Sequence, residues 1–144
     1  DENASVPHAG LLCDRRLSWL ENALAESPSP CLVFLHHHPL DTGFTGMDKI
    51  NLANAAEFRA LLTGSSVSHV FAGHVHRTIH ATIDGLPITV FKSPCHQQPM
   101  MFGAEGSSYS VDEPAGYGIL LTNGSDVVVH FEDVGLPEKP VLTY

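Results

Sequence analysis

Two apolar runs along the chain each end directly before a group of histidines. The run from Cys31 to Leu35 is apolar at every position, a pattern typical of a strand buried on both faces in the middle of a sheet. The run from Val67 to Ala72 is predicted to be a second buried strand. The first run is followed by His36, His37 and His38, and the second, after Gly73, by His74 and His76.

Helical spacing of apolar residues marks two further segments. Between residues 14 and 26 leucines recur at helical intervals, and Asp14 is placed to cap the first turn. Between residues 54 and 62 a second helix is predicted, because Asn54 and Glu57 resemble a capping box. The Ser-Pro repeat of residues 27–30 is the stop signal of the first helix, and Gly64 is that of the second.

The pattern beyond the second strand predicts two antiparallel hairpins. Residues 78–83 alternate polar and apolar side chains, an Asp-Gly turn signal follows, and residues 87–91 return as the partner strand. Residues 116–121 and 126–132 flank an Asn-Gly pair in the same way. The segments without periodicity are predicted to be loops, namely residues 1–12, 39–49 and 93–115 and the tail from Gly135.

This order of elements predicts an α/β fold with a mixed sheet and helices covering one side. The 144 residues, 43% of them apolar, fit a single domain with its own core. In open α/β sheets ligands bind beyond the carboxyl ends of the strands, so the two histidine groups are candidates to converge. In an extended backbone His74 and His76 would point to the same side, and Gly73 would let a metal or phosphate approach closely.

Composition narrows the chemistry of these histidines. Neutral imidazoles suit Zn, Fe, Mn, Co and Ni, and a bound ion of this kind can activate water for hydrolysis. Cys13, Cys31 and Cys95 lack CxxC spacing, so neither a disulfide framework nor a thiolate zinc site is indicated, and we expect small buried hydrophobes. The alternative that the histidines are ordinary surface or packed residues stays open at this point.

Charge and hydropathy exclude several classes of protein. The formal net charge of −9 disfavours a surface for polyanions, so no nucleic-acid polymer is expected as a partner. No apolar run reaches membrane-spanning length and no signal-peptide pattern opens the chain, so we expect a cytoplasmic protein without a membrane partner. Because residue 1 is Asp rather than Met, we expect the chain to begin inside a longer gene product, in which a leader would not be visible.

Three motifs together resemble the second half of the calcineurin-like metallophosphoesterases. Phe34-Leu35-His36-His37-His38-Pro39-Leu40 resembles the apolar strand ending in HHPP, Gly46-Met47-Asp48 the downstream MD, and Gly73-His74-Val75-His76-Arg77 the GHxH motif. Upstream, Asp1, Gly10-Leu11-Leu12 and Leu17-Ser18-Trp19-Leu20 look like the stretch before HHPP in one bacterial branch. That branch contains class III cyclic-nucleotide phosphodiesterases and glycerophosphodiesterases, and the resemblance reaches about residue 98.

The resemblance implies which histidines hold metal. His36 aligns with the ligand at the strand end, His74 joins it on the same ion, and His76 would bind a second ion. The implied cofactors are two divalent or trivalent ions of Mn, Fe, Zn or Co in the longer protein, with partial or no occupancy expected in residues 1–144 alone. The implied partner is a small phosphoester.

Two other histidines are the candidate catalytic residues. His96 resembles a histidine that faces the substrate phosphate, with an ordinary loop histidine as the alternative, and His37 aligns with a second histidine that is not usually a ligand. His38 replaces the first proline of HHPP, which would put another imidazole at the rim or have no consequence. Asp48 is at least as well suited to capping or orienting a loop as to taking part in the chemistry. The histidines without motif support are His8, His69, His80 and His130.

The family's first half supplies DxH, GD and GNHD, and none of these occurs in this sequence. We therefore expect residues 1–144 to be a single partial domain, the C-terminal portion of a four-layer αββα sandwich, with little activity alone. The parent would hydrolyse a cyclic nucleotide or glycerophosphodiester. The alternatives are a phosphomonoesterase or nucleotidase of the same family, and a non-catalytic metal-binding or dimerisation module. Half of a layered sandwich would leave its inner sheet face uncovered. This predicts a homo-oligomer, formed by dimerisation or by domain swapping.

Overall fold

The computed structural model describes residues 5–27, 29–103 and 109–136, so the resemblance at Asp1 and most of the predicted tail lie outside the described residues. Its elements are α1 (Asp14–Glu26), β1 (Cys31–Phe34), α2 (Thr45–Asp48), α3 (Ala55–Leu62), β2 (Val67–Ala72), β3 (Ile79–Ile83), β4 (Leu86–Val90), β5 (Gly116–Asn123) and β6 (Asp126–Asp133). The predicted helices and strands are all present, with ends that agree to within two residues. Across the described ranges, no helix combines the length and apolar character needed to cross a bilayer.

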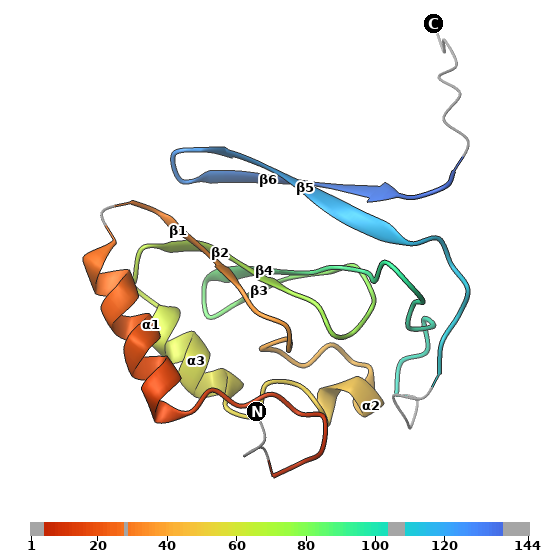
Figure 1. Ribbon diagram of the computed structural model, residues 1–144, viewed down its shortest axis with the longest axis horizontal. Helices are drawn as coiled ribbons and strands as arrows, with labels where there is room; N and C mark the ends of the chain where they lie inside the picture. The colour runs from red at the N-terminus through yellow and green to blue at the C-terminus, as the bar shows by residue number, and fades with distance from the viewer. Residues whose placement is uncertain (1–4, 28, 104–108, 137–144) are drawn as a thin grey trace, which may run out of the picture.

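The strands form two sheets. The larger has the order β1-β2-β4-β3, in which β1, β2 and β4 are parallel and β3 is antiparallel to β4. β5 and β6 pair antiparallel as a separate two-stranded sheet. Figure 1 shows α1 and α3 on one side of the larger sheet and the β5–β6 hairpin on the other. The predicted α/β class, with a mixed sheet and helices on one side, is confirmed.

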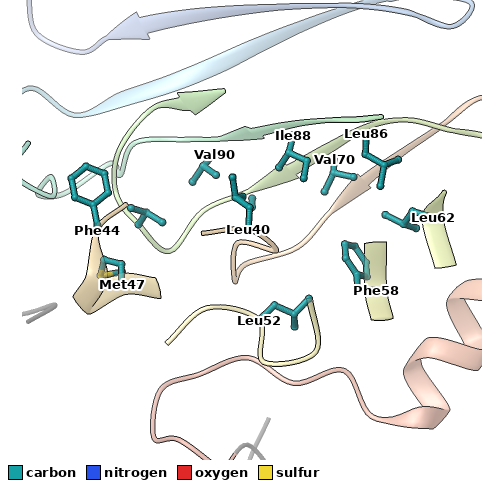
Figure 2. Close-up of a cluster of buried hydrophobic side chains, with 12 residues drawn as sticks. Leu40, Phe44, Met47, Leu52, Phe58, Leu62, Val70, Leu86, Ile88 and Val90 are labelled. Atoms are coloured by element: carbon teal, nitrogen blue, oxygen red, sulfur yellow. The ribbon is translucent and has the colours of Figure 1, made fainter. Parts of the chain in front are cut away.

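The core lies between the larger sheet and α3. Val70, Ile88 and Val90 reach from β2 and β4 toward the helix side, where Phe58 and Leu62 of α3 meet them (Figure 2). All five are almost fully buried. Burying each such side chain contributes about 1.5–3 kcal/mol, so this layer fixes the register of the central strands.

The position of β1 differs from the prediction. An apolar run predicted a strand in the middle of the sheet, but β1 is at an edge of the described sheet, paired only with β2. Its last residue, Phe34, is 63% exposed. The prediction of a strand buried on both faces is therefore wrong for β1, because within the described part of the chain the face opposite the helices is only partly covered at this edge.

A row of aromatic rings crosses the sheet face opposite the helices. Phe71 stacks between Phe34, at a centroid distance of 5.0 Å, and Phe91, at 5.6 Å. Phe131 of β6 continues the row 5.7 Å from Phe91. A Cβ on Gly118 would lie 2.1 Å from the Phe91 ring, so this position of β5 must be glycine for the hairpin to dock here.

The helix starts differ from the expected caps. The N-cap of α1 is Cys13, and Asp14 is the first helical residue. Asn54 is the N-cap of α3, but its side chain does not cap the helix. Its Oδ1 accepts from Leu12 N–H at 3.1 Å, and its Nδ2 donates to Leu12 O at 2.8 Å and to Glu57 Oε2 at 3.1 Å. The amide therefore joins two distant segments, which a local capping pattern does not reveal.

The predicted loop 39–49 contains the short helix α2. Asp48 at its end accepts hydrogen bonds from Thr42 N–H at 2.8 Å, Thr42 Oγ1 at 2.7 Å and Gly43 N–H at 3.0 Å. The carboxylate thus folds the loop back on itself. This geometry supports the interpretation that Asp48 orients a loop.

His69 gives the stability of this fold a dependence on pH. Its Nε2 lies 2.9 Å from Thr89 Oγ1, which also contacts His80 Nδ1 at 3.0 Å. Burial, and secondarily the charge of His80, lower the pKa of His69 below its usual value of 6.5. The unfolded chain therefore binds more protons below about pH 6.5, so the stabilising contribution of His69 is complete above that pH and is lost as the pH falls.

We expect His69→Gln to reduce this loss. Between pH 7 and pH 5 the free energy of unfolding, measured by urea denaturation with a chelator present, should fall less in the variant than in the parent chain. Because other histidines titrate in both proteins, the difference between the two slopes isolates His69. Equal slopes would show that this imidazole contributes nothing to the pH dependence.

Candidate metal centre

The carboxyl ends of β1 and β2 are held side by side beyond their last strand residues. Leu35 N–H donates to Phe71 O at 3.0 Å, and Gly73 N–H donates to His36 O at 3.0 Å. The parallel pairing of the two strands therefore extends to the first histidine. It places His36 next to the chain segment that carries His74 and His76.

The backbone of the His-x-His segment is not extended as expected. His74 has a φ of 70° and His76 a φ of 57°, both in the left-handed region. Between them Val75 is only 1% exposed, and its N–H donates to Gly73 O at 2.8 Å in a tight turn. Histidine is one of the few residues besides glycine that enter this region with some frequency. A tight turn, rather than strand alternation, therefore positions the two imidazoles.

His36 and His74 face each other closely enough to share an ion. His36 Nε2 and His74 Nδ1 are 3.2 Å apart, and the ring centroids are 5.0 Å apart. Two nitrogens that bind one tetrahedral zinc at about 2.0–2.1 Å lie about 3.3 Å from each other. The observed separation matches that requirement.

The environment of His74 keeps its imidazole neutral. Burial, followed by the neighbouring His37, His36 and His38, lowers the pKa of His74 to about 4. Its Nδ1 faces His36 Nε2, so a ring that binds metal through Nδ1 carries its proton on the buried Nε2, and the Ile50 backbone acts on the pKa in the opposite direction to burial. A neutral imidazole with a free lone pair is what a divalent cation binds. The residues therefore fit a metal ion.

His38 is buried rather than at the rim. It is 0% exposed and stacks on His74 with a centroid distance of 5.8 Å. Burial lowers its pKa to about 4, although Asp48 acts in the opposite direction, so at neutral pH the 3.5 Å contact from His38 Nε2 to Asp48 Oδ1 is not an ion pair. Neither ring nitrogen has a hydrogen-bond partner among the described residues.

His37 is held by the N-terminal loop. Its Nε2 donates to His8 O at 2.9 Å, and its ring centroid is 4.4 Å from that of His74. A Cβ on Gly10 would lie 2.5 Å from this ring, so glycine is needed for the close approach. Burial lowers the pKa of His37 and the His8 carbonyl partly offsets that effect. The geometry suits a residue that supports His74, and a catalytic role for His37 stays a prediction.

The three predicted metal ligands line one hollow of about 310 Å³. Aromatic residues of the sheet face, Phe71 and Phe91, form its floor together with His36, His74 and His76. A second hollow of about 70 Å³ is lined by His74, His76 and His96, and the His76 and His96 rings are 4.7 Å apart. Burial, and then the charge of His96, lower the pKa of His76. The structure thus brings His96 into the same region.

A model of the calcineurin-like phosphoesterase family matches residues 2–78, which is more than half of the 144 residues and includes His36, His74 and His76. The chain belongs to the calcineurin-like phosphoesterase family. Membership of this family implies divalent metal ions. His96 lies beyond the matched segment, so its role has less support than those of the other three histidines.

The chain is similar to several bacterial proteins. It is 38% identical over 132 residues to the probable cyclic nucleotide phosphodiesterase of Rhodopseudomonas palustris, covering 89% of the chain and 48% of that protein. It is 34% identical to the 3′,5′-cyclic adenosine monophosphate phosphodiesterase CpdA of Escherichia coli (74% and 38% covered). It is 38% identical to the glycerophosphodiester phosphodiesterase GpdQ of Enterobacter lignolyticus (67% and 38% covered). The chain therefore spans half or less of the length of these relatives.

Two residues that border the larger hollow were not predicted from the sequence. Lys92 and Ser93 follow β4, the third parallel strand, and line the larger hollow. Their position directly after a parallel strand could have indicated this. It was missed because β4 was predicted only as the antiparallel partner in a hairpin. Lys92 Nζ is already paired with Asp133 Oδ1 at 2.6 Å.

The prediction that the cysteines are buried hydrophobes is wrong. Cys95 is exposed, and Cys13 and Cys31 are half-buried. Short apolar-looking side chains in loops and at strand ends are not drawn inside when the segment runs along the surface. The Ser93 hydroxyl, followed by backbone N–H groups, lowers the pKa of the Cys95 thiol. The direct neighbour of Cys95 in the sequence is the polar His96, which was the one indication that Cys95 lies in an exposed segment.

Proposed function

We propose that this chain supplies the histidine-rich side of the metal centre of a phosphodiester hydrolase. The observation that carries the proposal is the pair of nitrogens His36 Nε2 and His74 Nδ1, 3.2 Å apart, with the pKa of His74 lowered to about 4 by burial and the neighbouring histidines. The names of the relatives, cyclic nucleotide and glycerophosphodiester phosphodiesterases, support this reaction class.

In this proposal His36 and His74 hold one ion and His76 contributes to a second, with Mn, Fe, Zn or Co as the metals. When bound, such ions supply Lewis-acid chemistry that activates water and neutralises charge on a phosphoryl group. His74 contributes a lone pair that is free throughout the neutral pH range, because its pKa is about 4. His37 holds the His74 ring in place through its contact with the His8 carbonyl. His96, on the surface beside His76, would contact the substrate phosphate.

We propose further that residues 1–144 form one partial domain of a longer hydrolase. The lengths of the relatives and the absence of DxH, GD and GNHD from the sequence support this view. The remaining ligands, and a group that protonates the leaving alkoxide, would then come from the rest of the protein. The substrate is a cyclic nucleotide or a glycerophosphodiester, and a phosphomonoester or nucleotide is the competing class.

The test compares the longer protein with this chain, using elemental analysis and turnover of bis(p-nitrophenyl) phosphate, 3′,5′-cyclic AMP and glycerophosphocholine. We expect two metal ions and diester turnover in the longer protein, and no turnover in the chain alone. In the longer protein His36→Asn should lower kcat by about 100-fold or more, whereas the matched variant His130→Asn, on the exposed face of β6, should have no effect. Full activity of His36→Asn, or turnover by the chain alone, would refute the proposal.

The outer face of the β5–β6 hairpin favours self-association as an additional property. Tyr117, Ile119, Leu121 and Val128 are between 46% and 55% exposed, and Leu121 pairs with Val128 across the hairpin. We propose that a second copy of the chain covers this face, by simple pairing or by exchange of the hairpin. Light scattering should show a dimer that Leu121→Lys converts to a monomer, and a monomeric parent chain at high concentration would contradict this.

A further inference from the structure

A second set of metal-binding side chains lies where the loop after β4 meets the His-x-His turn. His76, Cys95 and His96 each offer a ligand atom, and these atoms all lie within 4.8 Å of one another. Cys95 Sγ is 3.5 Å from His96 Nδ1. A sulfur at about 2.3 Å and a nitrogen at about 2.0–2.1 Å from one tetrahedral ion are about 3.6 Å apart, so this pair already has the required spacing.

The loop that carries Cys95 and His96 is rigidly built. The side chain of Gln97 is fully buried and spans the loop, because Ser93 N–H donates to Gln97 Oε1 at 2.9 Å and Gln97 Nε2 donates to Ser93 O at 2.7 Å. The backbone of Gln97 also pairs with Val111 in both directions. Both candidate ligands therefore sit on a loop that Gln97 closes, and Cys95 adds contacts to Ser93 Oγ, at 3.1 Å from its N–H and 2.9 Å from its Sγ.

The same loop is tied to the backbone of the third ligand. Gln98 N–H donates to His76 O at 3.1 Å, and Arg77 Nε donates to Gln98 O at 2.8 Å. The guanidinium of Arg77 also makes a bidentate contact with Glu113, at 2.8 and 3.0 Å. These bonds hold His76 and the Cys95–His96 pair in one fixed relation. Holding ligands in place before the ion arrives is what gives a metal site affinity and selectivity.

We propose that His76, Cys95 and His96 bind a divalent cation of the zinc and cobalt class through two imidazole nitrogens and one thiolate. Binding forms the metal–sulfur bond and releases the thiol proton to solvent. A thiolate selects zinc or cobalt over manganese and magnesium, and three protein ligands leave a fourth position open. The site consists of this chain's own side chains, so it stands whether or not a longer protein hydrolyses phosphodiesters. An ion bound here would make His96 a metal ligand in this chain rather than a contact to the substrate phosphate.

Cobalt(II) titration of the reduced, metal-free chain tests the site, because a cobalt–thiolate bond gives a charge-transfer band in the near ultraviolet. We expect the band in the parent chain and in Cys13→Ser, and its loss in Cys95→Ser. Zinc should displace the band, and a large excess of manganese or magnesium should not. Far-ultraviolet circular dichroism confirms that each variant is folded.

Two further variants separate this site from the His36–His74 pair. His36→Asn should lower the number of cobalt ions bound but leave the thiolate band. Arg77→Lys loses the bidentate contact with Glu113, so the cobalt affinity measured from the band should fall by roughly tenfold. A folded parent chain without the band, or a band that persists in Cys95→Ser, would overturn the proposal.

Discussion

Replacing His74 by asparagine is expected to weaken zinc binding at the His36–His74 pair by about 100-fold or more, which isothermal titration calorimetry of the metal-free chain would measure. Removing a direct ligand should cost at least as much as removing an outer-shell partner, for which about 10–100-fold is typical. Asparagine tolerates the left-handed backbone that residue 74 adopts, at a φ of 70°, so the turn should be preserved. The free energy of unfolding without metal should then change by only about 1 kcal/mol or less.

The proposed thiolate site provides an internal control for this variant. His74→Asn should lose one of the bound ions and keep the cobalt–thiolate band, because none of His76, Cys95 and His96 is altered. His130→Asn, a histidine on the exposed face of β6, should bind like the parent chain. If His74→Asn bound zinc as tightly as the parent, or lost affinity only through unfolding, His74 would not be a ligand.

Replacing Phe71 by alanine is expected to lower the free energy of unfolding by about 3–5 kcal/mol. Phe71 is 1% exposed and stacks on Phe34, on Phe91 and, at a centroid distance of 4.3 Å, on His69. Its removal would leave a cavity in the centre of the aromatic row and beneath the larger hollow. Urea denaturation of the metal-free chain measures the loss.

Phe34→Ala is the matched control for Phe71→Ala. The two residues are paired in register on β1 and β2, but Phe34 is 63% exposed. We expect its truncation to cost about 1 kcal/mol or less, as for most exposed positions. Similar losses for the two variants would mean that the exposed β1 edge is covered in solution, and that exposure does not separate the two positions.

The order of elements could be predicted from the sequence because hydrophobic periodicity reports which faces are buried. The two apolar runs before the histidine groups also indicated that His36 and the His-x-His segment would meet at one edge of the sheet, as parallel strands require. The position of β1 at the edge could not be predicted in this way. A continuous apolar run such as Cys31–Phe34 reports apolar surroundings, not the identity of the neighbouring strand.

The local geometry of the site depends on contacts that a sequence pattern does not contain. The left-handed conformations of His74 and His76 accompany a turn in which Val75 is buried between them, and no sequence pattern predicted that turn. The exposed position of Cys95 depends on the Gln97 side chain that closes its loop. Likewise, the β5–β6 hairpin packs on the larger sheet at Phe91 because Gly118 leaves room for that ring. Each of these requires knowledge of a partner distant in the sequence or of a backbone conformation.

The central claim is that β1 and β2 present His36 and His74 to one metal ion. Anomalous X-ray scattering from crystals of the zinc-loaded chain tests it most directly. The account predicts a zinc peak about 2.0–2.1 Å from both His36 Nε2 and His74 Nδ1. Zinc bound only elsewhere, with these two rings directed away from each other, would contradict it.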